Sequence, residues 1–216
     1  MRPYHATSDL PSQLAVFPLS GVLLLPRGQL PLNVFEPRYL AMVDAAMSGN
    51  RIIGMIQTRE PESQALTPAL SAVGCVGRIT SYSETEDGRY LITLTGICRF
   101  RVEDELKVDT PFRQVRPDYN PFAGDLVVMP ETDFPRERLL DALRGYLSQR
   151  DLKADWRSVM SAPAETLVNA LAMLCPFEPA EKQALLEAPG WMERVETLVA
   201  LLEMAGLPSP GGSTLN

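Results

Sequence analysis

Few side chains in this sequence have the types and spacing that nucleophilic catalysis requires. The chain contains three cysteines, Cys75, Cys98 and Cys175, and a single histidine, His5. A thiol acts as a catalytic nucleophile when a general base lies within hydrogen-bond reach. Each cysteine lies in an apolar run, which is typical of a reduced thiol that fills a core. We therefore interpret the cysteines as structural, and a Cys75–His5 or Cys98–His5 pair stays as the alternative hypothesis.

A serine–lysine pair is the second kind of nucleophile to consider. The lysines available for it are Lys107, Lys153 and Lys182. Lysine serves as a base when burial deprotonates it. None of the three stands near a serine in a motif that would bury it, and we expect Lys182 on an exposed helical face. The residues therefore predict no enzyme active site.

Motifs that hold a metal or a cofactor are missing from the sequence as well. No Cys-x-x-Cys or His-x-x-x-His pair occurs, so we expect no zinc site. Gly74-Cys75-Val76-Gly77 has two glycines but lacks the third glycine and the downstream lysine of phosphate-binding loops. We interpret its glycines as a β-bulge or a close strand crossing. The sequence thus predicts neither a metal nor a cofactor.

Charge, hydropathy and cysteine usage together indicate which partners and which cellular compartment fit this sequence. There are 27 acidic and 20 basic residues among 216, a net charge of −7, which disfavours a nucleic-acid partner or an anionic membrane surface. The longest charge-free stretch, residues 10–26, contains three prolines and is too short for a membrane span. An odd number of widely spaced cysteines indicates reduced thiols. We expect a cytoplasmic protein.

The first half of the chain reads as strands with one helix among them. A helix is expected to begin at Pro37 and end at Gly49. Asp87-Gly88 separates two alternating runs and predicts a hairpin. On the second run, Leu94, Cys98 and Phe100 should face the core, whereas Arg99 and Arg101 should face water. The expected strands cover residues 14–25, 30–35, 52–57, 73–83, 90–102 and 112–119.

The second half reads as helices. Prolines at positions 135 and 163 open two of them, and two more cover residues 178–187 and 191–204. The predicted fold class is therefore α+β. We expect a strand-rich subdomain over residues 11–122, a helical subdomain over 123–206, and disordered ends at 1–10 and 207–216.

Four sequence elements, in this order, carry a family resemblance. They are Leu-Ala-Val-Phe-Pro-Leu-Ser-Gly-Val-Leu-Leu-Leu-Pro at 14–26, Gln-Leu-Pro-Leu-Asn-Val-Phe-Glu-Pro-Arg-Tyr at 29–39, Val-Gly-Cys-Val-Gly-Arg-Ile at 73–79 and Leu-Thr-Gly-Ile-Cys-Arg-Phe-Arg at 94–101. Together they resemble the N-terminal, substrate-recognition domain of Lon proteases, in particular its stand-alone bacterial members. The resemblance extends over essentially residues 12–206.

This resemblance implies a fold and a function. It implies a PUA-like β-barrel with one inserted helix, followed by a C-terminal helical bundle. It also implies a non-catalytic peptide- or protein-binding module, an adaptor in protein quality control whose partners are unfolded or tagged polypeptides and an ATP-dependent protease. Full Lon proteases continue into AAA+ ATPase and Ser–Lys protease domains, neither of which this sequence shows. The alternative is a PUA-like nucleic-acid-binding module.

Six residues are the candidate peptide contacts within this hypothesis. Aromatic rings and guanidinium groups bind extended peptides in apolar grooves. For Phe35 and Tyr39, simple packing between strand and helix is the alternative. Arg38 is expected to have an acidic or backbone partner from elsewhere in the fold, because Glu36 should not share its helix face. The candidates are Phe35, Arg38, Tyr39, Tyr82, Arg99 and Tyr119.

Overall fold

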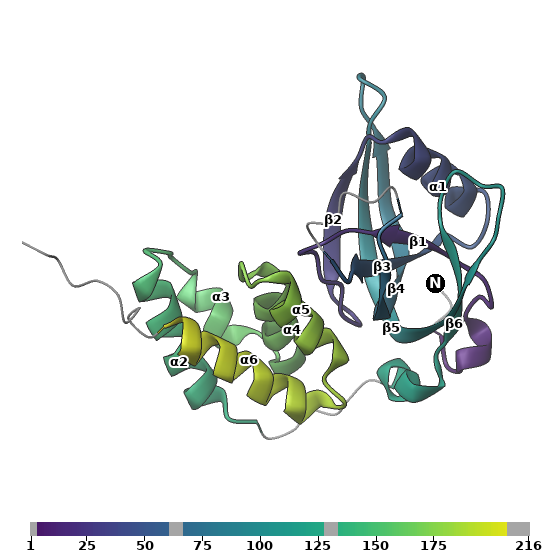
Figure 1. The fold of residues 1–216 in the computed structure, drawn as a ribbon. Helices are drawn as coiled ribbons and strands as arrows, with labels where there is room; N and C mark the ends of the chain where they lie inside the picture. Colours follow the sequence, from purple (N-terminus) through teal and green to yellow (C-terminus); the bar gives the residue numbers. More distant parts are fainter. Residues whose placement is uncertain (1–3, 61–66, 128–133, 207–216) are drawn as a thin grey trace, which may run out of the picture. The chain divides into compact units, whose positions relative to one another are not determined.

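The structure is a computed structural model, and it describes residues 4–60, 67–127 and 134–206 (Figure 1). The chain forms two compact units. The first comprises Met1–Met129 and Met173–Glu187, and the second comprises Pro130–Ala172 and Ala188–Asn216. The expected division into 11–122 and 123–206 stays a prediction. Residues 173–187, which come from the helical second half of the chain, nevertheless belong to the first compact unit. The reason is that the helix α5 (Pro179–Glu187) packs on the sheet. The expected disordered tail, 207–216, lies outside the described residues.

A six-stranded sheet organises the first unit. Its strands follow the order β2-β5-β4-β3-β1-β6, and β6 also pairs with β5, so that the pairing from β5 through β4, β3, β1 and β6 returns to β5. Only β1 and β3 run parallel among the paired strands. The bounds are β1 (Leu14–Pro18), β2 (Gln29–Val34), β3 (Ile52–Thr58), β4 (Leu70–Glu84), β5 (Tyr90–Leu106) and β6 (Gln114–Asp118). With its helices, this sheet confirms the predicted α+β class.

The long β4–β5 hairpin matches the predicted turn. It projects beyond the rest of the sheet in Figure 1. Gly88 has a φ of +77°, the left-handed region that glycine enters without a steric penalty. The Asp-Gly signal in the sequence therefore located the turn correctly.

The helix expected after the second strand is α1 (Pro37–Met47), with proline at its first position. It buries Tyr39, Val43 and Ala46, as the apolar spacing predicted, and also Met42, whereas Leu40 and Met47 of the predicted apolar stripe are only half-buried. The N-terminal segment differs from the expected disorder. Residues 7–9 form η1 (Thr7–Asp9), and the Asp9 carboxylate accepts hydrogen bonds from the backbone N–H groups of His5 and Ala6. The side chain of Leu10 is buried, and this anchors the segment.

The predicted alternation of buried and exposed side chains along β5 is confirmed for the face toward the core, but the prediction that Arg99 is exposed is wrong. Leu94, Cys98 and Phe100 have no exposed surface, and Arg101 is exposed. Arg99 was expected to face water, yet it is only 4% exposed. The structural reason is that η2 (Asn120–Leu126) and α5 (Pro179–Glu187) contact the outer face of β5 at this position, where Asp125 and the Leu186 carbonyl bond the guanidinium.

Gly74 allows two strands to approach its backbone closely. A Cβ atom there would lie 2.5 Å from Cζ of Phe100 and 2.6 Å from the Met55 carbonyl oxygen. The register between β4 and β5 shifts between Val76 and Gly77. The interpretation of this glycine pair as a bulge and a close crossing is therefore confirmed.

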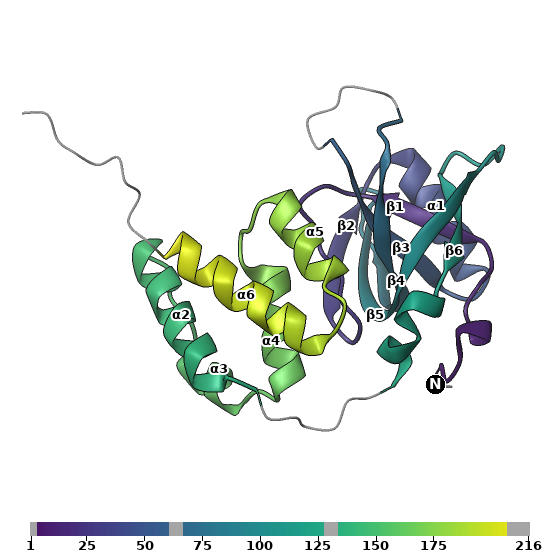
Figure 2. The same ribbon diagram turned by 60° about the horizontal axis from the view of Figure 1, so that its bottom comes forward.

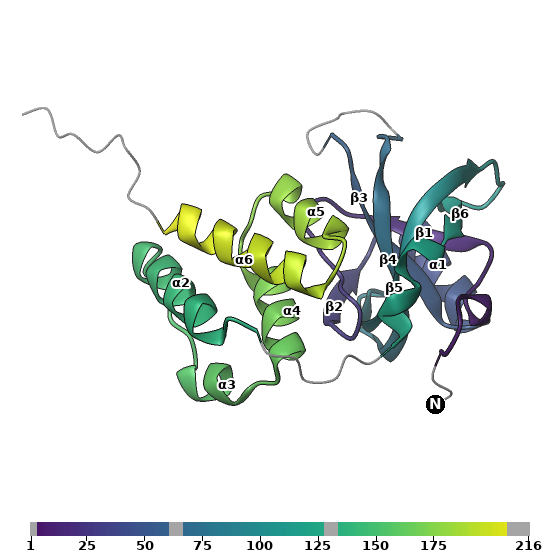
Figure 3. The same cartoon turned by 90° about the horizontal axis from the view of Figure 1, so that it is seen from below.

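The second unit is helical. Its elements are α2 (Arg136–Gln149), α3 (Trp156–Ser161), most of α4 (Ala164–Leu174) and α6 (Trp191–Ala205). Figures 2 and 3 show α2 and α6 side by side, and the buried side chains of these two helices include Leu139, Leu143, Val195 and Leu198. The Arg136 guanidinium donates to the carbonyls of Val159, Met160 and Ala162 at the end of α3. These carbonyls lack partners within their own helix, so the arginine caps it.

Candidate functional site

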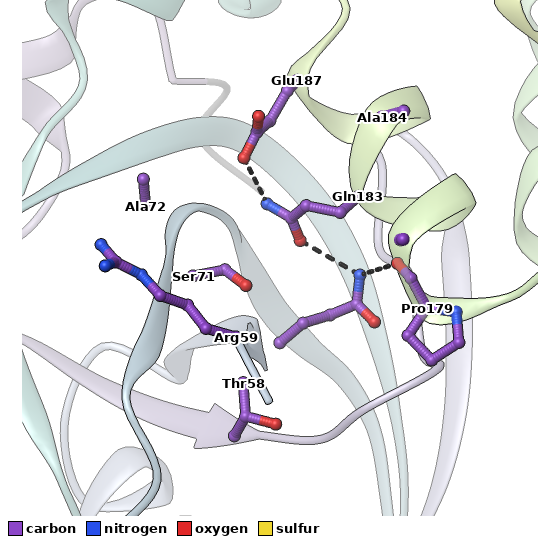
Figure 4. Close-up of a pocket in the computed structure, with 10 residues that line it drawn as sticks. Thr58, Arg59, Ser71, Ala72, Pro179, Gln183, Ala184 and Glu187 are labelled. Carbon is purple, nitrogen blue, oxygen red and sulfur yellow. Dashed lines mark hydrogen bonds between the residues drawn. The ribbon is translucent and has the colours of Figure 1, made fainter. Parts of the chain in front are cut away.

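A pocket of about 490 Å³ lies within the first unit, between the adjoining ends of β3 and β4 and the helix α5 (Figure 4). This volume falls in the range of small-ligand sites, roughly 300–1,000 Å³. The strand side contributes polar groups, and the helix contributes mainly small residues. The lining residues are Gln57, Thr58, Arg59, Ser71, Ala72, Pro179, Ala180, Gln183, Ala184 and Glu187.

Two glutamine amides hold α5 against the strands and form one wall of the pocket. Nε2 of Gln57 donates to the Pro179 carbonyl at 3.0 Å and to Oε1 of Gln183 at 3.1 Å. Nε2 of Gln183 donates in turn to Oε1 of Glu187 at 2.7 Å. Figure 4 shows this series of bonds running along the helix. Gln57 is 2% exposed and its two bonds are partly buried, whereas the bond from Gln183 that orients the Glu187 carboxylate is exposed.

Three polar groups of the pocket remain open to a ligand. The hydroxyl of Ser71, whose residue is 8% exposed, has no hydrogen-bond partner in the described part of the chain. The same holds for the guanidinium of Arg59, which is exposed. The third group is the carboxylate of Glu187: its Oε1 accepts a bond from Gln183, and its Oε2 has no hydrogen-bond partner among the described residues. The site therefore offers donors on the strand side and an acceptor on the helix side, around a floor of alanine methyl groups.

Lys182, which was expected on an exposed helical face, is buried on the opposite side of α5. It is 8% exposed, and its ammonium donates to the carbonyl of Gly21 at 2.9 Å and of Met173 at 3.4 Å. Burial lowers the pKa of this lysine. The exposed-face prediction was wrong because Lys182 shares the buried face with Leu185 and Leu186, at positions i, i+3 and i+4. That spacing was the signal that could have found it.

None of the six residues predicted to contact peptide lines this pocket. Phe35 is 60% exposed and follows β2, where the Arg89 guanidinium lies over its ring. Tyr82 is 38% exposed and lies on β4 in the β4–β5 hairpin, where its ring contacts that of Tyr90. Their role in peptide binding stays a prediction. The pocket itself carried no sequence signal, because alanines, glutamines and single charges are common on any helix surface.

Arg38 pairs with Glu36, contrary to the expectation of a partner from elsewhere. Its guanidinium lies 2.8 Å from Oε2 of Glu36 and 4.5 Å from the centre of the Tyr39 ring. The expectation was wrong because Glu36 precedes the first helical residue and has an extended backbone, so that its side chain is not confined to the helical spacing.

The remaining three candidates are buried in the first unit. Tyr39 packs on Phe17 with ring centres 4.1 Å apart. The Tyr119 hydroxyl donates to the Pro11 carbonyl. Arg99 is occupied by Asp125. Tyr39 therefore packs between strand and helix, which was the alternative to a peptide contact. All three side chains are buried and expose little surface to which a peptide could bind.

The chemistry of the thiols matches the structural interpretation. All three cysteines are buried. Burial, with a smaller effect from the Asp125 carboxylate, raises the pKa of Cys98 to about 12. In residues 4–60, 67–127 and 134–206, no group of three or more histidine, cysteine, aspartate or glutamate side chains is placed to hold a metal ion. No helix over the same ranges is long and apolar enough to cross a membrane.

Comparison with known proteins identifies the family. Residues 13–204 match the substrate-binding domain of the ATP-dependent protease La (LON), and the chain belongs to that family.

Curated relatives include Lon proteases from several bacteria. Lon protease 2 of Sorangium cellulosum is 27% identical over 195 residues, which cover 87% of this chain and 24% of that protein. The Lon protease of Magnetococcus marinus is 26% identical over 209 residues, 93% of this chain and 26% of that protein. The Lon protease of Desulfosudis oleivorans is 30% identical over 105 residues, 48% of this chain and 13% of that protein. The chain thus spans between 13% and 26% of the length of these three relatives.

Two solved structures share the fold. The Lon N-terminal domain protein from Xanthomonas campestris has a TM-score of 0.61 and 24% identity, covering 88% of this chain and 98% of that one. The N-terminal domain of the Mycobacterium avium complex Lon protease has a TM-score of 0.58 and 16% identity, covering 88% and 97%.

Proposed function

We propose that this chain is a non-catalytic module that binds segments of polypeptide and selects them for an ATP-dependent protease. The observation that carries the proposal is the match of residues 13–204 to the Lon substrate-binding domain. In this proposal the protein works in the cytoplasm as an adaptor, and the strand pairing that returns from β6 to β5 is the PUA-like barrel.

The pocket beside α5 supports the proposal physically. An extended polypeptide offers an alternating series of N–H donors and carbonyl acceptors, and it binds where fixed polar groups face it across an apolar surface. Ser71, Arg59 and Glu187 supply such groups, and the alanines between them leave room for a main chain. The buried thiols, with the raised pKa of Cys98, favour a binding role over a catalytic one.

Binding of an unfolded polypeptide tests this function. The probe is a fluorescently labelled model protein that has been reduced and carboxymethylated, so that it cannot fold, and its native form is the matched control. We expect a saturable rise in anisotropy at micromolar protein for the unfolded probe and none for the native one. Absence of binding at high micromolar concentration would overturn the proposal.

A second measurement separates the proposal from its rivals. Labelled single-stranded RNA should not bind, and a shift that weakens steeply with added salt would instead favour the nucleic-acid alternative. Neither ATP hydrolysis nor peptide cleavage should accompany the purified chain. Turnover that disappears on substitution of one serine or cysteine would contradict the non-catalytic role.

A further inference from the structure

The pocket beside α5 carries two opposite charges that do not neutralise each other. Arg59 follows the end of β3 and Glu187 ends α5, so that the charges belong to different walls (Figure 4). Neither side chain forms an ion pair with a described residue. The carboxylate of Glu187 is oriented by its bond from Gln183, which keeps it at the rim.

A third group points to a ligand independently of these charges. Ser71 is 8% exposed and lines the pocket, and no described residue bonds its hydroxyl. The oxygen atom itself keeps contact with solvent. A ligand carbonyl or carboxylate that enters the pocket would replace water at this hydroxyl.

The rest of the lining limits the size of what can enter. Ala72, Ala180 and Ala184 are exposed toward the pocket and present only methyl groups. The two walls are held together by the partly buried bonds of Gln57 to the Pro179 carbonyl and to Gln183. The walls therefore cannot separate without breaking these hydrogen bonds, and narrow segments with small side chains fit best.

We propose that this pocket takes a short extended peptide of small residues flanked by an acidic and a basic group, and that it reads the direction of the chain. The proposal rests on the proposed function and names the substrate class of the same site. The acidic group of the peptide lies against Arg59 and Ser71, and the basic group lies against Glu187. When the main chain runs in the same direction, a peptide with the opposite order of charges places like charges together at both ends, which disfavours it.

Two peptides of identical composition test the direction. Their sequences are Lys-Ala-Ala-Ala-Asp and Asp-Ala-Ala-Ala-Lys, each with blocked termini and a fluorescent label on a glycine linker. We expect one to bind about threefold to tenfold more tightly than the other, the effect of exposed charge contacts at the two ends. Equal affinity of the two peptides would overturn the proposal.

A charge-swapped protein makes the test specific to these residues. The double variant Arg59→Glu with Glu187→Arg keeps the net charge and should invert the preference between the two peptides. The matched control is Arg116→Glu with Glu103→Arg, an exposed pair of positions outside the pocket, which should keep the original preference. An unchanged preference in the Arg59 and Glu187 variant contradicts the proposal.

Filling the pocket supplies the final control. Ala184→Trp should weaken both peptides at least tenfold, whereas Ala45→Trp, an equally exposed alanine on α1, should not. Circular dichroism establishes that each variant is folded. Retained peptide affinity in folded Ala184→Trp would overturn the proposed site. If the unfolded model protein still binds the wild-type chain while the peptides do not, this inference fails and the proposed function stands. If neither binds, both fail.

Discussion

Arg99 and Asp125 form a two-point ion pair inside the first unit. Nε of the arginine lies 2.9 Å from Oδ2, and Nη2 lies 3.0 Å from Oδ1, with both side chains at or below 10% exposure. Asp125 also accepts the backbone N–H of Arg99, and the guanidinium donates to the carbonyl of Leu186. The pair therefore joins β5, η2 and α5 at one point.

Removing one partner of this pair should be strongly destabilising. We expect Asp125→Ala to lower the free energy of unfolding by about 3–5 kcal/mol, because Arg99 is then left charged and buried. Urea unfolding followed by circular dichroism measures the loss. Asp141→Ala, which breaks the exposed Arg144–Asp141 pair on α2, is the matched control and should have no measurable effect. Similar stabilities for the two variants would show that the Arg99 pair is exposed in solution.

Lys182 should make stability depend on alkaline pH. Burial lowers its pKa below the ordinary value of 10.5, so the unfolded chain binds more protons than the folded chain between the lowered pKa and 10.5. The free energy of unfolding contributed by Lys182 therefore rises with pH between its lowered pKa and 10.5. We expect wild type to gain stability relative to Lys182→Met as the pH rises from 7 to 10.5 in urea unfolding.

The matched control for this pH effect is Lys153→Met, at an exposed position. The difference between wild type and Lys153→Met should not change with pH. A constant difference for Lys182→Met as well would mean that the amine of Lys182 is hydrated in the folded protein.

The three thiols should be unreactive until the protein unfolds. At pH 8 the thiolate fraction of Cys98, with a pKa of about 12, is about a thousandfold below that of a thiol with the ordinary value of 9.0. Titration with a disulfide reagent should report fewer than one fast-reacting thiol in the native protein and three in denaturant. Rapid reaction of any thiol in buffer would contradict its burial.

Gly74 should not tolerate even a methyl group. We expect Gly74→Ala to lower the free energy of unfolding by about 1–3 kcal/mol or more, because the new Cβ meets the Phe100 ring and a backbone carbonyl that cannot move aside. Gly124→Ala is the control, since its Cβ would have no atom within 4 Å. Equal stability of the two variants would mean that the crossing at Gly74 is looser than described.

Local sequence patterns predicted most of the elements correctly. Proline at position 37 located the start of α1, Asp87-Gly88 located the hairpin, and the period of two on β5 placed Cys98 and Phe100 in the core. These features depend on the intrinsic geometry of neighbouring residues, which the sequence alone determines. The four ordered sequence elements between residues 14 and 101 likewise indicated the family to which the chain belongs.

Tertiary structure alone decided the burial of Arg99 and the existence of the pocket. Both depend on α5, whose Gln183 bonds Gln57 across 126 positions of sequence. Alternation along one strand or helix gives two faces but does not say what covers each of them. For Arg99 the cover is η2 and α5, and for the pocket it is a helix that the sequence pattern assigned to the other half of the chain. Such long-range docking depends on the fit of whole surfaces, which no local period records.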